Sequence, residues 1–135
     1  MSWCQALDVS GSGLRAASLR MSVVAENIAN ADATRTPEGG PYRRRVVLLG
    51  SAPGLDGAGL RGVQVVGVTA AAGAARRVYQ PGHPDADAQG YVQVPNVDVP
   101  LEMADLTVAN RVYQANTVAL QTIRRSLNET INLLS

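Results

Sequence analysis

Residues 101–134 read LEMADLTVANRVYQANTVALQTIRRSLNETINLL. Large side chains recur in this stretch every seven residues, at Leu106, Tyr113, Leu120, Leu127 and Leu134. A repeat of this length is typical of helices that pack side by side along one face. Asp98 can cap such a helix, and Pro100 is acceptable in its first turn. The stretch predicts a helix roughly 50 Å long, since each residue adds about 1.5 Å.

The offset positions of this repeat hold Ala109, Ile123 and, less well, the polar residues Asn116 and Thr130. A polar residue there commonly sets the register and number of packed helices, and the alternative is that Asn116 simply faces solvent. A second apolar stripe lies on a neighbouring face of the same helix and consists of Val108, Val112, Ala115 and Ala119. A helix with two apolar faces needs more neighbours than a two-helix hairpin supplies, so we expect this helix to pack in a larger assembly.

The same repeat occurs near the start of the chain, at Leu7, Leu14, Met21, Ile28 and, in an offset position, Val24. Gly11 and Gly13 each weaken a helix by about 1 kcal/mol relative to alanine, so we expect the helix to be firm from about Leu14 and conditional before it. The helix should end near residues 30–32, before the breaker run TPEGGP at 36–41.

The middle of the chain contains nearly all of its glycine and proline, with short valine-rich runs between them. These runs predict strands at 42–49, 62–69, 76–79 and 91–94. The fold class is therefore mainly α with a small β insert. We expect residues 1–35 and 98–135 to form one helical core domain as a coiled-coil pair. We expect residues 36–97 to form a β-containing insert displayed outside that pair.

Composition argues against several functional classes. The net charge of +1 gives no general attraction to nucleic acid or to anionic membranes. The densest basic cluster, Arg43–Arg45, is better explained as a solvated strand end than as a phosphate-binding patch. Cys4 stands alone, which excludes an intramolecular disulfide and a cysteine-rich metal site. No Sec signal or membrane-spanning run is recognisable, so we expect synthesis in the cytoplasm without a cleaved signal.

Two motifs could carry chemistry, and neither is convincing. Residues 11–16 match G-x-G-x-x-A, but no buried strand precedes them as a dinucleotide site requires. His83 lies beside Asp85 and Asp87, where a metal site or a general base is conceivable. The flanking prolines and glycine favour an exposed turn. We expect no catalytic site, no cofactor, no metal and no small-molecule substrate.

Several stretches together resemble the flagellar basal-body rod protein family, over nearly the whole chain. Near the start, DVSGSGL at 8–14 and VVAENIANA at 23–31 look like the signature shared by flagellar rod and hook proteins. GPYRR at 40–44 fits one branch of that family. Further motifs are HPDADAQGYV at 83–92, PNVDV at 95–99, EMADL at 102–106 and RVYQAN at 111–116.

The resemblance implies a structural, non-enzymatic subunit of the proximal rod of the bacterial flagellum. Members of the family leave the cytoplasm through the flagellar type III export apparatus with an uncleaved signal. They assemble with sibling rod proteins and copies of themselves into the helical drive shaft that crosses the periplasm and serves motility. The basal-body membrane ring is a further candidate partner. The family packs its terminal helices in the inner tube and its insert outside.

One rival function is a cytosolic coiled-coil adaptor that binds a single partner helix through the same heptads. Heptads alone do not separate the two functions. The segment 83–99 favours the rod, because an adaptor has no reason to carry it. A metal-dependent enzyme centred on His83 is a more distant alternative.

Overall fold

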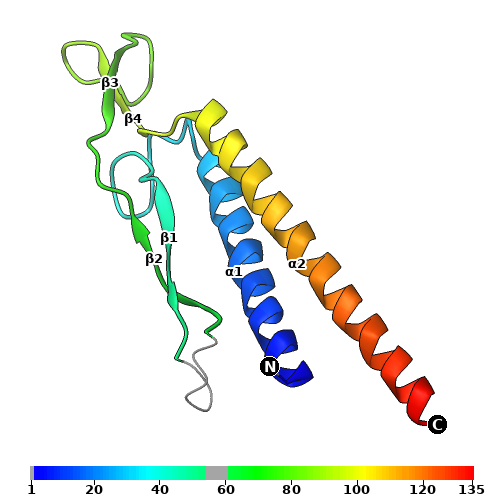
Figure 1. The fold of residues 1–135 in the computed structure, drawn as a ribbon. Coiled ribbons are helices and arrows are strands. Elements are labelled where there is room, and N and C mark those ends of the chain that lie inside the picture. Colours follow the sequence, from blue (N-terminus) through cyan, green and yellow to red (C-terminus); the bar gives the residue numbers. More distant parts are fainter. Residues whose placement is uncertain (1, 54–60) are drawn as a thin grey trace.

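The computed structural model describes residues 2–53 and 61–135 and shows a mainly α fold with a small β segment. Two helices pack against each other, and two short antiparallel hairpins lie between them in the sequence (Figure 1). The elements are α1 (Trp3–Ala29), β1 (Arg45–Ser51), β2 (Val63–Ala70), β3 (Arg76–Tyr79), β4 (Tyr91–Val94) and α2 (Val99–Leu134).

Helix α1 begins at Trp3, so it includes the turns before Leu14 that were expected to be conditional. Ser2 and Gln5 form a capping box: Ser2 Oγ accepts from Gln5 N at 3.2 Å, and Gln5 Oε1 accepts from Ser2 N at 3.0 Å. This cap supplies partners for two backbone N–H donors that would otherwise be unpaired at the start of the helix. The added stability offsets the low helix propensity of Gly11 and Gly13. The helix ends at Ala29, close to the predicted end.

Helix α2 is confirmed at both ends. Asp98 is its N-cap and accepts a hydrogen bond from Leu101 N at 3.4 Å, with Pro100 in the first turn. A proline is tolerated there because the first turn has no use for its missing N–H. The helix continues to Leu134, as the heptad repeat predicts.

The four predicted strands are all present, with shifted starts or ends for the first two. They form two separate two-stranded sheets, β1 with β2 and β3 with β4, both antiparallel. Strand β1 begins at Arg45 and not at Tyr42, because the lead-in turns toward the helices, where Tyr42 N donates to Ala33 O at 2.9 Å. The β1–β2 hairpin runs alongside α1 (Figure 1).

Helix α1 therefore contacts two neighbours, α2 and the β1–β2 hairpin. Small side chains allow this close approach: Ser12, Ala16 and Ala17 are all buried. Ser12 Oγ accepts a hydrogen bond from Val63 N of β2 at 2.9 Å and donates to Val9 O at 2.7 Å. Burial of α1 against a hairpin was not expected from the single heptad seam.

The best-packed region lies where α1 ends and α2 begins. The largest fully buried side chains there are Glu102, Val92, Asn27 and Pro95, and two of these four are polar. In the ranges that the structure describes, no helix is long and apolar enough to cross a membrane.

Candidate assembly surface and buried polar cluster

The side chains predicted for subunit packing lie along both helices. Their role between subunits stays a prediction, and the structure shows where each stands in the single chain. Val24 is buried, Tyr113 and Leu134 are exposed, and the others are half-buried: Leu7, Leu14, Met21, Ile28, Leu106, Asn116, Leu120, Ile123 and Leu127.

Contacts between the helices show that they run antiparallel. A Cβ built at Gly13 would lie 2.8 Å from Asn116 Oδ1, and Asn116 Nδ2 donates to the backbone of its own helix at Val112 O, 3.0 Å away. Leu14 and Tyr113 line one shallow groove. Asn116 is therefore packed on α1, which removes the alternative that it merely faces solvent.

This register leaves the end of α2 without a partner from α1. Asn116 stands opposite Gly13, so a helix that begins at Trp3 has no residues left to cover the last turns of α2. Figure 1 shows α2 extending past the start of α1. Ile131 is 58% exposed and Leu134 is 84% exposed, although both continue the face that packs on α1.

The second apolar stripe of α2 is also open. Val108 is 49% exposed and Val112 is 43% exposed, and Ala115 on the same stripe is exposed. Leu101, about two turns before Val108, adds to this surface at 57% exposed. Contiguous apolar surface of this kind is typical of an interaction site.

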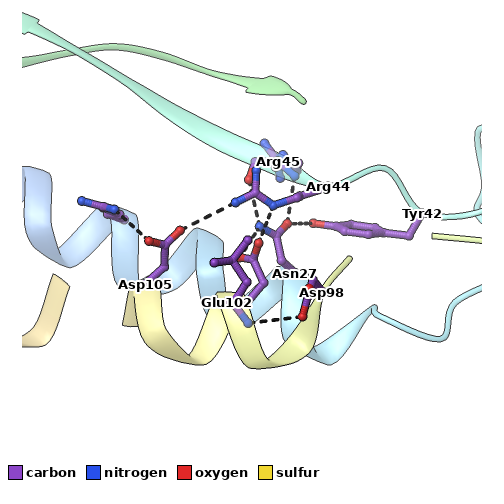
Figure 2. Close-up of polar contacts among 9 residues, drawn as sticks. Asn27, Tyr42, Arg44, Arg45, Asp98, Glu102 and Asp105 are labelled. Atoms are coloured by element: carbon purple, nitrogen blue, oxygen red, sulfur yellow. Dashed lines mark hydrogen bonds and ion pairs between the residues drawn. The ribbon is translucent and has the colours of Figure 1, made fainter. Parts of the chain in front are cut away.

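A polar cluster is buried at the other end of the helix pair (Figure 2). Asn27 of α1 is fully buried, and its side chain makes four hydrogen bonds. Its Oδ1 accepts from Tyr42 OH and from Arg45 N, both at 2.9 Å. Its Nδ2 donates to Arg45 O at 2.8 Å and to Glu102 Oε2 at 3.1 Å. The amide therefore uses its full hydrogen-bonding capacity.

Glu102 of α2 is the charged member of the cluster and is also fully buried. Its Oε1 accepts from Arg44 Nε, which forms an ion pair with it. Arg44 also lies 3.7 Å from Asp105, and Asp105 pairs with Arg20 of α1 at 3.2 Å. The cluster thus joins α1, the segment before β1 and the first turns of α2. Figure 2 shows these side chains converging from the three segments.

The expectation of a solvated strand end at Arg43–Arg45 is wrong for Arg44 alone, since Arg43 and Arg45 are exposed and Arg45 begins β1. Arg44 reaches the buried Glu102, and Arg45 Nη1 pairs with Glu26 of α1 at 3.0 Å, whereas Arg43 is exposed. One signal was present in the sequence: Glu102 occupies the offset position of the α2 repeat seven residues before Ala109. A carboxylate on a packing face requires a buried cationic partner.

Burial changes the acid–base behaviour of Tyr42 in this cluster. Desolvation raises the pKa of its phenol above the ordinary value, and the negative charge of Glu26 raises it further. The neutral hydroxyl is the form that donates to Asn27. Tyr42 therefore acts as a hydrogen-bond donor and has no place in acid–base chemistry near neutral pH.

The His83 region forms the predicted turn, although His83 and Asp85 are half-buried and not exposed. His83 Nδ1 accepts from Asp85 N at 3.0 Å. Asp85 accepts from Thr34 Oγ1 at 2.7 Å and pairs with Arg35, which ties the turn to the end of α1. Among the described residues, no group of three or more His, Cys, Asp or Glu side chains is placed to hold a metal ion.

Residues 11–16, which match the dinucleotide motif by letter, lie inside α1. A dinucleotide site needs these residues as a loop between a strand and a helix. A continuous helix does not present backbone N–H groups from its interior, because they bond within the helix. The structure therefore gives no support to nucleotide binding at this motif.

Family models match both ends of the chain. The model described as flagella basal body rod protein matches residues 7–35, which include most of α1. The model described as flagellar basal body rod FlgEFG protein C-terminal matches residues 88–133, which include β4 and α2. The matched segments are the helices that pack together, with part of the second hairpin.

Individual relatives match nearly the full length. Flagellar basal-body rod protein FlgC of Escherichia coli O6:H1 is 44% identical over 128 residues, which cover 93% of each chain. The FlgC protein of Yersinia enterocolitica is 42% identical over 98% of each chain. The FlgC protein of Bacillus subtilis is 38% identical over 94% of this chain and 95% of its own. The chain belongs to the family of flagellar basal-body rod proteins FlgC.

Proposed function

We propose that this chain assembles into the proximal part of the flagellar rod by packing its two terminal helices against copies of itself and sibling rod proteins. As a member of its family, it is a structural subunit of the flagellar rod and is located in the basal body. Its contribution is mechanical and not enzymatic: packed helices transmit torque along the shaft.

The open apolar surface of α2 is the observation that supports this proposal. The face that packs on α1 continues past the start of α1 to Ile131 and Leu134, and a second stripe at Val108 and Val112 is also exposed. Burying a large apolar side chain contributes about 1.5 to 3 kcal/mol. Ordering the chain costs about 1 to 2 kcal/mol per residue, so several neighbours are needed.

In this arrangement residues 1–35 and 98–135 act as the helical core domain, packed as a coiled-coil pair. Residues 36–97 are the insert on the outside of the shaft, where the β3–β4 hairpin is free for other contacts. Export through the flagellar type III apparatus without a cleaved signal precedes assembly. The basal-body membrane ring is a candidate partner of the insert.

Mass spectrometry of detergent-purified hook–basal bodies tests the proposal, with soluble cytoplasm from the same cells as the control. Enrichment at a few copies per particle is expected. A chain that stays in the soluble fraction, while sibling rod proteins are found in the particles, would favour the coiled-coil adaptor. That rival uses the same apolar faces for a single partner helix.

A further inference from the structure

The β3–β4 hairpin is joined to the rest of the molecule less closely than the β1–β2 hairpin. Among the described elements, β3 and β4 contact each other but neither helix and neither strand of the other sheet. Figure 1 shows this hairpin standing beyond the end of α1. In the described residues, the side-chain hydrogen bonds and ion pairs that join the connection 80–90 to segments outside the hairpin all start at Asp85. The position of this connection therefore depends on where its turn holds Asp85.

Asp85 contacts two side chains of the segment that follows α1. Its Oδ2 accepts a hydrogen bond from Thr34 Oγ1 at 2.7 Å, and its Oδ1 pairs with Arg35. Thr34 is half-buried and the Asp85 side chain is 23% exposed, so water reaches this contact only in part. Hydrogen bonds to an ionised carboxylate are stronger than those between neutral groups. These bonds tie the connection 80–90 to the end of α1.

The imidazole of His83 holds Asp85 from within the turn. Its Nδ1 accepts a hydrogen bond from Asp85 N at 3.0 Å, and in the described residues Asp85 N has no other acceptor. An imidazole nitrogen accepts only while it carries no proton, so this bond requires a neutral ring with its proton on Nε2. A protonated ring would direct one N–H group at another and has to move away. The place of Asp85 therefore depends on the charge of His83.

The charges around the turn act in the same direction. On the connection itself they are Asp85 and Asp87, from the segment after α1 there is Arg35, and from β3 there is Arg77. Asp87 and Arg77 pair at 3.1 Å, so together they add little net charge. A cationic ring would attract the Asp85 carboxylate and compete with Arg35 and the Thr34 hydroxyl for it. Protonation of the ring thus removes one bond to Asp85 and weakens the other two.

We propose that His83 is a proton-sensitive joint, which holds the connection 80–90 on the end of α1 when neutral and releases it when protonated. Histidine is the side chain that ordinarily changes charge between about pH 5 and pH 8. The tie is present above this range and is lost as the pH falls through it. Strand β4 stays in place because Val92 is only 1% exposed, so the connection swings without unfolding of the hairpin. This inference goes beyond the proposed function and concerns the single chain.

A titration of the ¹⁵N-labelled full-length chain by nuclear magnetic resonance, from about pH 8 to about pH 5, tests the joint. His83 is the single histidine of the chain, so protein without a histidine tag gives one pair of ring-nitrogen signals. The ring is expected to carry its proton on Nε2 at the upper end of the range. The amide signals of Asp85 and Thr34 are expected to shift with the same midpoint as the ring.

The two carboxyls of the turn do not confuse this measurement. Asp85 and Asp87 stay ionised throughout, because their hydrogen bonds hold both pKa values below the ordinary 3.8. A neutral ring with its proton on Nδ1 would overturn the proposal. Amide signals of Asp85 and Thr34 that stay constant while the ring titrates would overturn it as well.

His83→Asn and His83→Gln form a matched pair of variants. The asparagine Oδ1 stands at the same number of bonds from the backbone as Nδ1, so it can accept from Asp85 N, and it does not titrate. This variant should keep the tied signals of Asp85 and Thr34 at every pH of the range. The longer glutamine places its amide nearer the position of Nε2, and this variant should show the released signals at every pH. A transition that persists in His83→Asn, or equal behaviour of the two variants, would contradict the joint.

The Tyr79–Tyr91 pair separates release from unfolding. Its rings lie 5.3 Å apart across β3 and β4, and their near-ultraviolet circular dichroism should persist while His83 titrates. Loss of that signal together with the His83 titration would mean that the hairpin unfolds, which would overturn the joint. None of these outcomes bears on enrichment of the chain in basal bodies, so this inference and the proposed function fail separately.

Discussion

Gly13 of α1 lies directly against the side chain of Asn116 of α2, so closely that a Cβ at position 13 would stand 2.8 Å from Oδ1 and 3.0 Å from Nδ2. Real Cβ atoms do not approach other atoms to 2.8 Å, so the glycine permits the contact. A glycine inside a helix costs about 1 kcal/mol relative to alanine. Here that cost is offset by the close approach of the two helices.

Gly13→Ala is therefore expected to destabilise the monomer, by about 1 to 2 kcal/mol in the free energy of urea unfolding. Gly11→Ala is the matched control, because a Cβ there meets only the end of the Arg15 side chain at 3.7 Å. The control should stabilise by about 0.5 to 1 kcal/mol through helix propensity. Equal stabilisation by both substitutions would show that Asn116 moves aside freely.

Adding Asn116→Ala to Gly13→Ala separates the clash from other effects. The shorter side chain removes the atoms that the new Cβ would meet, so the double variant should recover most of the stability lost in the single one. The measurement is a double-mutant cycle by urea unfolding. Purely additive effects would mean that the two positions do not interact.

Asn27→Ala should destabilise the subunit by about 2 to 4 kcal/mol, because it leaves Tyr42 OH and the backbone of Arg45 without partners in a buried site. Asn110→Ala is the matched control on an exposed face of α2. It should change the free energy of unfolding by less than about 0.5 kcal/mol. The measurement is urea unfolding followed by circular dichroism, and similar values for both variants would exclude a structural role of the cluster.

Leu120→Asp should abolish incorporation into the rod while leaving synthesis of the chain intact. Leu120 is half-buried on the predicted packing seam, and a charge there opposes burial by a neighbouring helix. Gln121→Asp adds the same charge on the exposed face and should be incorporated normally. Immunoblots of purified basal bodies and spreading in soft agar measure the outcome. Normal incorporation of Leu120→Asp would count against the seam.

Acid should weaken the β3–β4 region and its tie to the end of α1. Hydrogen bonds from Tyr91 N and Gln89 N lower the pKa of Asp87, and the Thr34 hydroxyl and Arg35 lower that of Asp85. Both carboxyls thus stabilise the fold above their ordinary pKa of 3.8. That stabilisation is lost as the pH falls through their lower folded-state values.

Near-ultraviolet circular dichroism of the Tyr79–Tyr91 pair, whose rings lie 5.3 Å apart, reports this acid transition. Asp87→Asn should reduce the dependence on pH below about 4, since the amide does not titrate. Asp32→Asn, in an exposed position, should leave the transition unchanged. An unaltered transition in Asp87→Asn would show that another group controls it.

Much of the fold could be predicted from local patterns. The seven-residue repeat, the cap at Asp98 and the valine-rich runs identified both helices and all four strands. The sequence left the turns of α1 before Leu14 conditional because of their glycines, and the capping box at Ser2, which depends on hydrogen-bond geometry, shows the helix starting at Trp3. The resemblance to rod proteins rested on motifs spread over the chain, which the relatives then confirmed.

The candidate site was harder to predict, because its contacts join residues far apart in the chain. Asn27 and Glu102 were visible as letters within the resembling motifs, but their burial required knowing that the lead-in to β1 crosses the ends of both helices. The exposed end of α2 could not be deduced either. It depends on the antiparallel register, which the contact of Gly13 with Asn116 reveals.

The sequence by itself determined the two helices, the strand segments and the family, because heptad spacing, capping residues and turn residues act over a few neighbouring positions. Only the tertiary structure decided which end of the helix pair is closed and which is open. Burial of Glu102 depends on Arg44 and Asn27 meeting it in space, and no local pattern carries that information. Long-range pairing of polar groups in a low-dielectric interior is the physical reason for the difference.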